Sequence, residues 1–101
     1  MFRITVNYHH PEDPEHFLTH YRDVHAPLTM TMPGVTSFEW GVCETLDGTR
    51  PEHFVVGVLT FPSKDAAIAG LSSAEGQAGA ADMANFATAG AVIDMHEVNV
   101  A

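Results

Sequence analysis

The sequence predicts a single α+β domain with the ferredoxin-like element order βαββαβ, and three observations predict it. Apolar and polar residues alternate over residues 2–8, as in a strand with one buried face. Apolar residues then recur at helical spacing between residues 15 and 28. Two strand-like segments, a helical region and a last strand-like segment follow. This order predicts a four-stranded antiparallel sheet with helices on one face.

The first half of the chain supplies two strands and one helix. After the strand Phe2–Tyr8, the turn-forming and acidic stretch "HHPEDPE" favours a helix start near Glu15. The residues expected to face the core from this helix are Phe17, Tyr21, Val24 and Leu28. Pro33 and Gly34 end the helical pattern, and a second strand is expected over residues 35–44.

The second half begins with the loop "LDGTRPE" and a third strand over residues 53–61. That strand is apolar on both faces, so we expect it in the centre of the sheet. Ser63 is a suitable N-cap for a helix that ends near Leu71. One or two short helical pieces rich in alanine and glycine continue to about Gly90, and the last strand is expected over residues 91–100.

The composition limits the classes of partner. The 101 residues are 46% hydrophobic and 17% charged, which is typical of one globular domain, residues 1–101. The formal charge of −9 disfavours nucleic acid and anionic membrane surfaces. No apolar run reaches the roughly 18 residues of a membrane span, so we expect a cytoplasmic protein. A single cysteine, Cys43, excludes an intramolecular disulfide and a cysteine-rich metal site.

The apolar pattern also predicts a homodimer. Two helices cover one face of a four-stranded sheet, yet the third strand is apolar on both faces and the second carries Phe38, Trp40 and Val42 on one side. An apolar sheet face of this extent is rarely left in water. The same face of a second subunit is the expected cover, which gives a two-sheet barrel with two-fold symmetry.

His25 is the candidate functional residue of the first helix. Pro27 lacks an N–H and clashes with the preceding turn, so the regular helix is expected to end or kink near His25. A side chain at such a break can enter a cleft that a regular helix does not reach. The alternative is a histidine that only hydrogen-bonds the broken helix end.

Two other histidines precede His25 on the same helix. His16 and His20 have the four-residue spacing of a metal-binding pair, but a pair is half a site, so we expect a solvated face and no metal. On a regular helix, His20 and His25 flank opposite sides of the apolar stripe. They therefore cannot share a ligand unless the helix is broken, and we expect His20 at the surface.

These residues form the pattern of a known family. The segments "EHFLTHYRDVHAPL", "MPGVTSFEWG" and "SSAEGQAGAADMANFATAG" closely resemble the EthD-like family of dimeric α+β barrel proteins. The residues that match its pattern in order are Phe17, Tyr21, His25, Pro27, Leu28, Pro33, Gly34, Ser73, Asp82 and Phe86. The family is named for a protein associated with bacterial degradation of ethyl tert-butyl ether. The match extends over nearly the whole chain.

The resemblance implies small-molecule chemistry. Relatives include lactone isomerases of aromatic catabolism, in which the histidine matching His25 faces the substrate cleft. A tyrosine that contributes there matches Phe38, which lacks the hydroxyl. The wider superfamily includes cofactor-free oxygenases and haem-degrading enzymes, and Asn7 and Trp40 are similar to residue types that these enzymes use.

We therefore expect an enzyme, without cofactor or metal, that acts on an aromatic, lactone or polyketide-like molecule. His25 is the expected general acid or base, because an imidazole titrates near neutral pH. Tyr21 is expected to orient His25 or the ligand, and Asn7 to hydrogen-bond a carbonyl. The expected ligand-binding residues are Trp40, Phe38, Met32, Asp82 and Phe86. For Asp82, capping a helix and orienting His25 are equal alternatives. The competing functions are a non-catalytic binding or accessory protein and, third, a haem-binding protein with His25 as the axial ligand.

Overall fold

The computed structural model describes all residues, 1–101, and contains one four-stranded antiparallel sheet. The strands are β1 (Phe2–Tyr8), β2 (Ser37–Val42), β3 (Val55–Phe61) and β4 (Ala91–Glu97). Their spatial order is β2-β3-β1-β4, so the two central strands are β1 and β3. The predicted ferredoxin-like fold, including the central position of the third strand, is confirmed. The second, third and fourth strands are each shorter than predicted.

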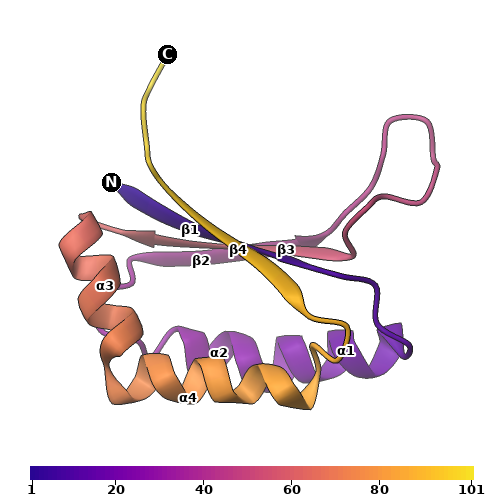
Figure 1. The fold of residues 1–101 in the computed structure, drawn as a ribbon, viewed down its shortest axis with the longest axis horizontal. Coiled ribbons are helices and arrows are strands. Elements are labelled where there is room, and N and C mark those ends of the chain that lie inside the picture. Colours follow the sequence, from indigo (N-terminus) through magenta and orange to yellow (C-terminus); the bar gives the residue numbers. More distant parts are fainter.

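The helices lie together on one side of the sheet (Figure 1). They are α1 (Pro14–His20), the π-helical turn η1 (Tyr21–His25), α2 (Ala26–Thr29), α3 (Lys64–Ser72), α4 (Ala74–Asp82) and the 3₁₀ turn η2 (Met83–Asn85). The first three form one continuous helix that runs beside α4 beneath the sheet. Asp13 caps α1, and Ser63 caps α3 as predicted. Ser73 caps α4, which separates the two helical pieces of the second half.

The π-helical turn changes which residues of the first helix face the core. The N–H of Ala26 donates to the carbonyl of Tyr21, five residues earlier, so one extra residue enters this turn. His25 therefore follows Tyr21 on the buried face, and Val24 is 45% exposed. The prediction that Val24 faces the core is wrong for this reason. The helix widens before Pro27 instead of ending there, and Pro27 occupies the first turn of α2.

The core lies between the sheet and the helices and is strongly aromatic. Tyr8, Phe17, Tyr21 and Phe86 are each at most 1% exposed, and their ring centroids lie 5.1–5.6 Å apart. Most of these contacts are edge-to-face or tilted, an arrangement that aromatic quadrupoles favour. The cluster fixes the continuous helix against β1 and against the segment after α4. The aromatic cluster therefore sets the positions of the histidines of α1 and η1.

The other face of the sheet carries no helix. The β1 burial pattern alternates, with Phe2, Ile4, Val6 and Tyr8 buried beneath the helices, so Arg3, Thr5 and Asn7 lie on the uncovered face. The strand register adds Val56, Val58 and Val92 to it. Phe38 and Trp40 are opposite Leu59 and Gly57 and pack on Tyr21, so these two aromatic residues belong to the helix side. The apolar side chains on the uncovered face are thus those of valine residues.

Candidate functional site

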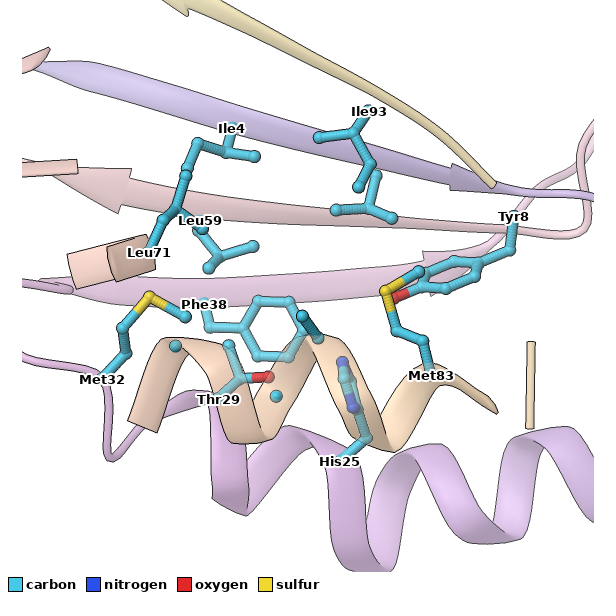
Figure 2. Close-up of a pocket in the computed structure, with 14 residues that line it drawn as sticks. Ile4, Tyr8, His25, Thr29, Met32, Phe38, Leu59, Leu71, Met83 and Ile93 are labelled. Carbon is cyan, nitrogen blue, oxygen red and sulfur yellow. The ribbon is translucent and has the colours of Figure 1, made fainter. Parts of the chain in front are cut away.

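A cavity of about 90 Å³ lies between the sheet and the helices (Figure 2). Its walls are mainly apolar and include Ile4, Phe38, Leu59, Met83 and Ile93. Small residues of α4 open it, because a Cβ added to Gly79 would meet no atom within 4 Å. An apolar cavity of roughly 150 Å³ holds a benzene ring. The present cavity therefore has room for a small apolar group, or for one arm of a molecule that extends through its mouth.

Three polar side chains line this apolar space: His25, Thr29 and Tyr8. The π-helical turn brings His25 inward, and Thr29 follows one helical turn later on the same face. The two are 6% and 4% exposed, respectively. In Figure 2 the His25 ring and the Thr29 hydroxyl both point toward the cavity. Burial raises the pKa of Tyr8 to about 12, so its hydroxyl stays protonated at neutral pH.

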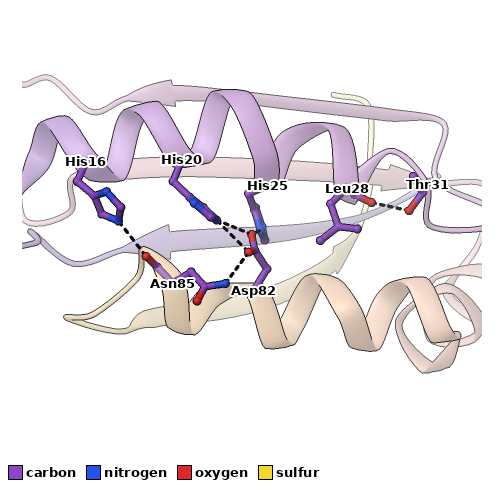
Figure 3. Close-up of polar contacts among 7 residues, drawn as sticks. All are labelled: His16, His20, His25, Leu28, Thr31, Asp82 and Asn85. Atoms are coloured by element: carbon purple, nitrogen blue, oxygen red, sulfur yellow. Dashed lines mark hydrogen bonds and ion pairs between the residues drawn. The ribbon is translucent and has the colours of Figure 1, made fainter.

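Asp82 orients the imidazole of His25 (Figure 3). The Nδ1 of His25 lies 2.9 Å from Oδ2 of Asp82, and both side chains are less than 10% exposed. An ionised carboxylate only accepts, so Nδ1 carries the proton and Nε2 carries the lone pair. No protein group hydrogen-bonds Nε2. The geometry selects the orienting role for Asp82 from the two alternatives.

Burial lowers the pKa of His25, although the hydrogen bond and the charge of Asp82 act in the opposite direction. His25 is therefore neutral at neutral pH. Burial acts to raise the pKa of Asp82, but hydrogen bonds from Asn85, His20 and His25 outweigh it and hold that pKa below its ordinary value. The pair at neutral pH is thus a carboxylate and a neutral imidazole, with a bare nitrogen at the cavity.

His20 is also bound to Asp82, contrary to the expectation of a surface residue. Its Nε2 lies 2.9 Å from Oδ1 and 3.1 Å from Oδ2 of Asp82. The side chain is 18% exposed and stacks on Phe86, with ring centroids 5.5 Å apart. Because of the wide π-helical turn, His20 and His25 lie on the same side of the helix, and both can therefore bind the Asp82 carboxylate. His16 also lies on this side; its ring hydrogen-bonds the Asn85 carbonyl and lies 6.1 Å from the His20 ring, centroid to centroid.

The remaining predicted site residues fall into two groups. Met32 and Phe38 line the cavity, as expected of ligand-binding residues. Phe86 and Tyr21 lie behind His25, with ring centroids 4.6 and 5.3 Å from its ring. The Tyr21 hydroxyl is buried and makes no hydrogen bond of good geometry, although the Tyr8 hydroxyl lies near it. Burial, and then Tyr8, raise the pKa of Tyr21 well above the ordinary value. Tyr21 therefore supports the imidazole by packing and makes no hydrogen bond to it.

Trp40 and Asn7 do not reach the cavity. Trp40 packs on Tyr21, with ring centroids 4.9 Å apart, and supports His25 only through that ring. Asn7 lies opposite Val56 and Val92 on the uncovered face, so the sheet separates it from His25. Among the histidines, cysteine and acidic residues, no group of three is arranged to hold a metal ion. No helix is long and apolar enough to cross a membrane.

The sequence reasoning missed Thr29, Tyr8, His20 and the cavity-forming Gly79. The signal for Thr29 was present, since Phe17, Tyr21, His25 and Thr29 recur every four residues and all four are buried. A regular helix rotates such a series off one face, and the wide turn restores it. Nothing in the sequence alone marked this turn as π-helical.

The fold and the site define a class: a ferredoxin-like protein with an apolar cavity and a carboxylate-bound histidine at its wall. Comparison with known sequences gives the family. The EthD domain model matches residues 9–90, and the chain belongs to this family. It is 44% identical over 90 residues to an uncharacterized 11.0 kDa protein from the thcB-thcC intergenic region of Rhodococcus erythropolis, covering 89% of this chain and 87% of that one.

Solved structures agree with the fold. An EthD family protein from Bacillus halodurans has a TM-score of 0.91 at 22% identity, covering 98% of this chain and 99% of that chain. A cofactor-independent oxygenase from Streptomyces nogalater has a TM-score of 0.67 at 13% identity, with coverage of 99% and 93%. Dimeric ferredoxin-like proteins also share the fold. These likenesses show the architecture, and the chemistry is argued from the site.

Proposed function

We propose that this protein binds a small, largely apolar molecule in the cavity and that His25 transfers a proton to or from it. The observation that carries the proposal is the bare Nε2 of His25 at the cavity wall, with Nδ1 fixed on Asp82. A general base needs an oriented lone pair and a pKa that leaves it unprotonated at the working pH. Asp82 would also stabilise the imidazolium that forms after His25 accepts the proton.

The cavity chemistry supports a carbonyl-bearing aromatic, lactone or polyketide-like ligand. The apolar walls would bury the arm of its carbon skeleton that enters the cavity, and the Thr29 hydroxyl would donate a hydrogen bond to its oxygen. In the proposed step a C–H bond of the ligand breaks, its electron pair moves toward the carbonyl oxygen, and the proton goes to Nε2 of His25. Returning the proton to another carbon gives an isomerisation without a cofactor. Reaction of the same carbanion with dioxygen, which would serve as the oxidant and form the new C–O bond, is the alternative outcome.

A homodimer formed through the uncovered sheet face is part of this proposal. Its support is the valine side chains on that face, of which Val92 is exposed and Val56 and Val58 are half-buried, and the existence of dimeric proteins with the same fold. Analytical ultracentrifugation tests it. The cytoplasmic location stays a prediction from the sequence, which cell fractionation tests.

A binding or accessory protein without catalysis remains the competing function, and variants separate the two. A panel of aromatic, lactone and polyketide-like compounds is screened by chemical-shift changes at cavity amides, and bound compounds are then assayed for turnover. His25→Ala is expected to keep the fold and abolish turnover. His16→Ala, at an exposed position on the same helix, is expected to keep both the fold and the turnover. Binding without turnover in the wild type would favour an accessory protein. A haem fits poorly, since a cavity of about 90 Å³ admits one arm of a ligand but not a rigid macrocycle of four pyrrole rings.

A further inference from the structure

The Asp82 carboxylate is shared by two histidines, one at the cavity and one nearer to solvent. Its Oδ2 accepts from Nδ1 of His25, and its Oδ1 accepts from Nδ2 of Asn85, both at 2.9 Å. The Nε2 of His20 contacts both oxygens, at 2.9 and 3.1 Å. We propose that His20 is a positioning residue that holds this carboxylate in the rotamer in which it accepts the Nδ1–H of His25.

His20 contacts both oxygens of the Asp82 carboxylate, whereas each of the other two donors contacts one. It is the only side chain that spans both carboxylate oxygens, so it fixes the plane of the carboxylate as well as its position. The ring of His20 is itself fixed by stacking on Phe86, which also contacts the His25 ring. The ion pairs of Asp82 involve these two histidines and no lysine or arginine. No lysine or arginine therefore neutralises the carboxylate, which is stabilised by hydrogen bonds from His20, His25 and Asn85.

Two histidines on one carboxylate titrate as a coupled pair. The first proton taken up in acid gives one imidazolium beside one carboxylate, which is a favourable pair. A second proton would place two cations on one anion, and a charged His20 accordingly lowers the pKa of His25. The charge that His20 can carry thus opposes protonation of His25, whose burial already disfavours the charged form.

Other titratable groups near this pair do not alter the argument. On the same helix, the His16 ring hydrogen-bonds the Asn85 carbonyl and lies 6.1 Å from the His20 ring, centroid to centroid, but makes no hydrogen bond to Asp82. Tyr21 packs against the His25 ring. From β1, Tyr8 has a pKa raised to about 12 by burial and stays neutral. From α4 and η2, the charged group is Asp82 itself, and Asn85 does not titrate. The coupling is therefore between His20, His25 and Asp82.

The proposal rests on the proposed function for its importance, but its test needs no ligand. In ¹⁵N-labelled protein, NMR reports the tautomer and the titration of each imidazole from about pH 8 to about pH 5, the range in which histidine titrates. His20→Gln keeps an N–H donor at a similar reach and removes the titration. His20→Leu removes both the donor and the titration. His16→Gln is the matched control on the same helix.

The expected results separate positioning from charge. The Nδ1–H tautomer of His25 persists in the wild type, His20→Gln and His16→Gln, and becomes a mixture in His20→Leu. The pKa of His25 is expected to stay as in the wild type in His16→Gln and to rise in His20→Gln, because the charge that His20 can carry lowers it. If His20→Leu does not fold, His20→Gln still decides the coupling. A pure Nδ1–H tautomer in folded His20→Leu, or an unchanged His25 titration in His20→Gln, would overturn the proposal. Absence of any ligand would instead overturn only the proposed function.

Discussion

Two glycines on one helix are predicted to respond to the same substitution with opposite sign. A Cβ on Gly79 would enter the cavity and meet no atom within 4 Å, whereas a Cβ on Gly76 would collide with the carbonyl oxygen of Gly70 and lie 2.6 Å from that of Leu71. Gly79 thus keeps the cavity open, and Gly76 allows α3 and α4 to pack closely. Both residues lie in α4, Ala74–Asp82.

Gly79→Ala is expected to stabilise the protein and weaken ligand binding. Alanine in a helix interior is favoured over glycine by about 0.5–1 kcal/mol, and the added methyl group displaces no neighbour. For a domain of this size such a gain raises Tm by roughly 2–8 °C. The methyl group takes space that a ligand would occupy, and Gly79→Leu is expected to abolish binding altogether.

Gly76→Ala is the matched control. The clash with backbone atoms forces α3 and α4 apart, and the expected loss is about 1–3 kcal/mol. Urea unfolding at equilibrium, followed by circular dichroism, gives both free energies of unfolding. A destabilised Gly79→Ala, or a ligand that binds Gly79→Leu as well as it binds the wild type, would refute the assignment of this cavity.

Three further predictions concern the site and its support. The free energy of unfolding is expected to fall as the pH drops below about 6.5. Burial lowers the pKa of His25 in the folded chain, so the unfolded chain takes up the proton first. The pKa of Asp82 is also lowered in the folded chain, so this carboxylate adds a further loss at pH below 3.8. Urea titrations at several pH values measure this, and stability that rises between pH 6.5 and 5 would contradict it. Tyr21→Phe is expected to change stability by less than about 1 kcal/mol, because the hydroxyl it removes makes no hydrogen bond of good geometry; a larger loss in urea unfolding would show that the Tyr8 hydroxyl is its partner. Phe17→Ala is expected to cost about 3–5 kcal/mol, since Phe17 is fully buried in the aromatic cluster, and a midpoint shift near zero would be inconsistent with that packing.

The fold was predictable from the sequence because its signals are local and repeated. Alternation over Phe2–Tyr8 and the turn at Pro33 and Gly34 each depend on a few neighbouring residues, and all reappear in the structure. The ends of the strands were less predictable. Residues 98–100 have the composition of a strand, but β4 ends at Glu97 with its pairing to β1. A strand ends where its hydrogen-bonded pairing with the neighbouring strand ends, and the sequence does not show that position.

The site was predictable only in part because its geometry depends on one irregular turn. His25 was identified from its place beside Pro27, and Asp82 from the family resemblance. On a regular helix, Val24 would face the core and His20 would lie on the other side of the apolar stripe from His25. The extra residue in the turn Tyr21–His25 reverses both results, since it shifts every later residue of the helix by one position. The face occupied by Asn7 likewise required the strand register.

The position of a bound ligand relative to His25 tests the central claim most directly. A crystal structure with the tightest compound from the screen is predicted to show it in the cavity bounded by Phe38, Met83 and Gly79. Its reacting atom is expected within about 2.6–3.2 Å of Nε2 of His25, the reach of a general base. A ligand on the uncovered face beside Arg3 and Glu39, or one in the cavity without contact to Nε2, would contradict the account.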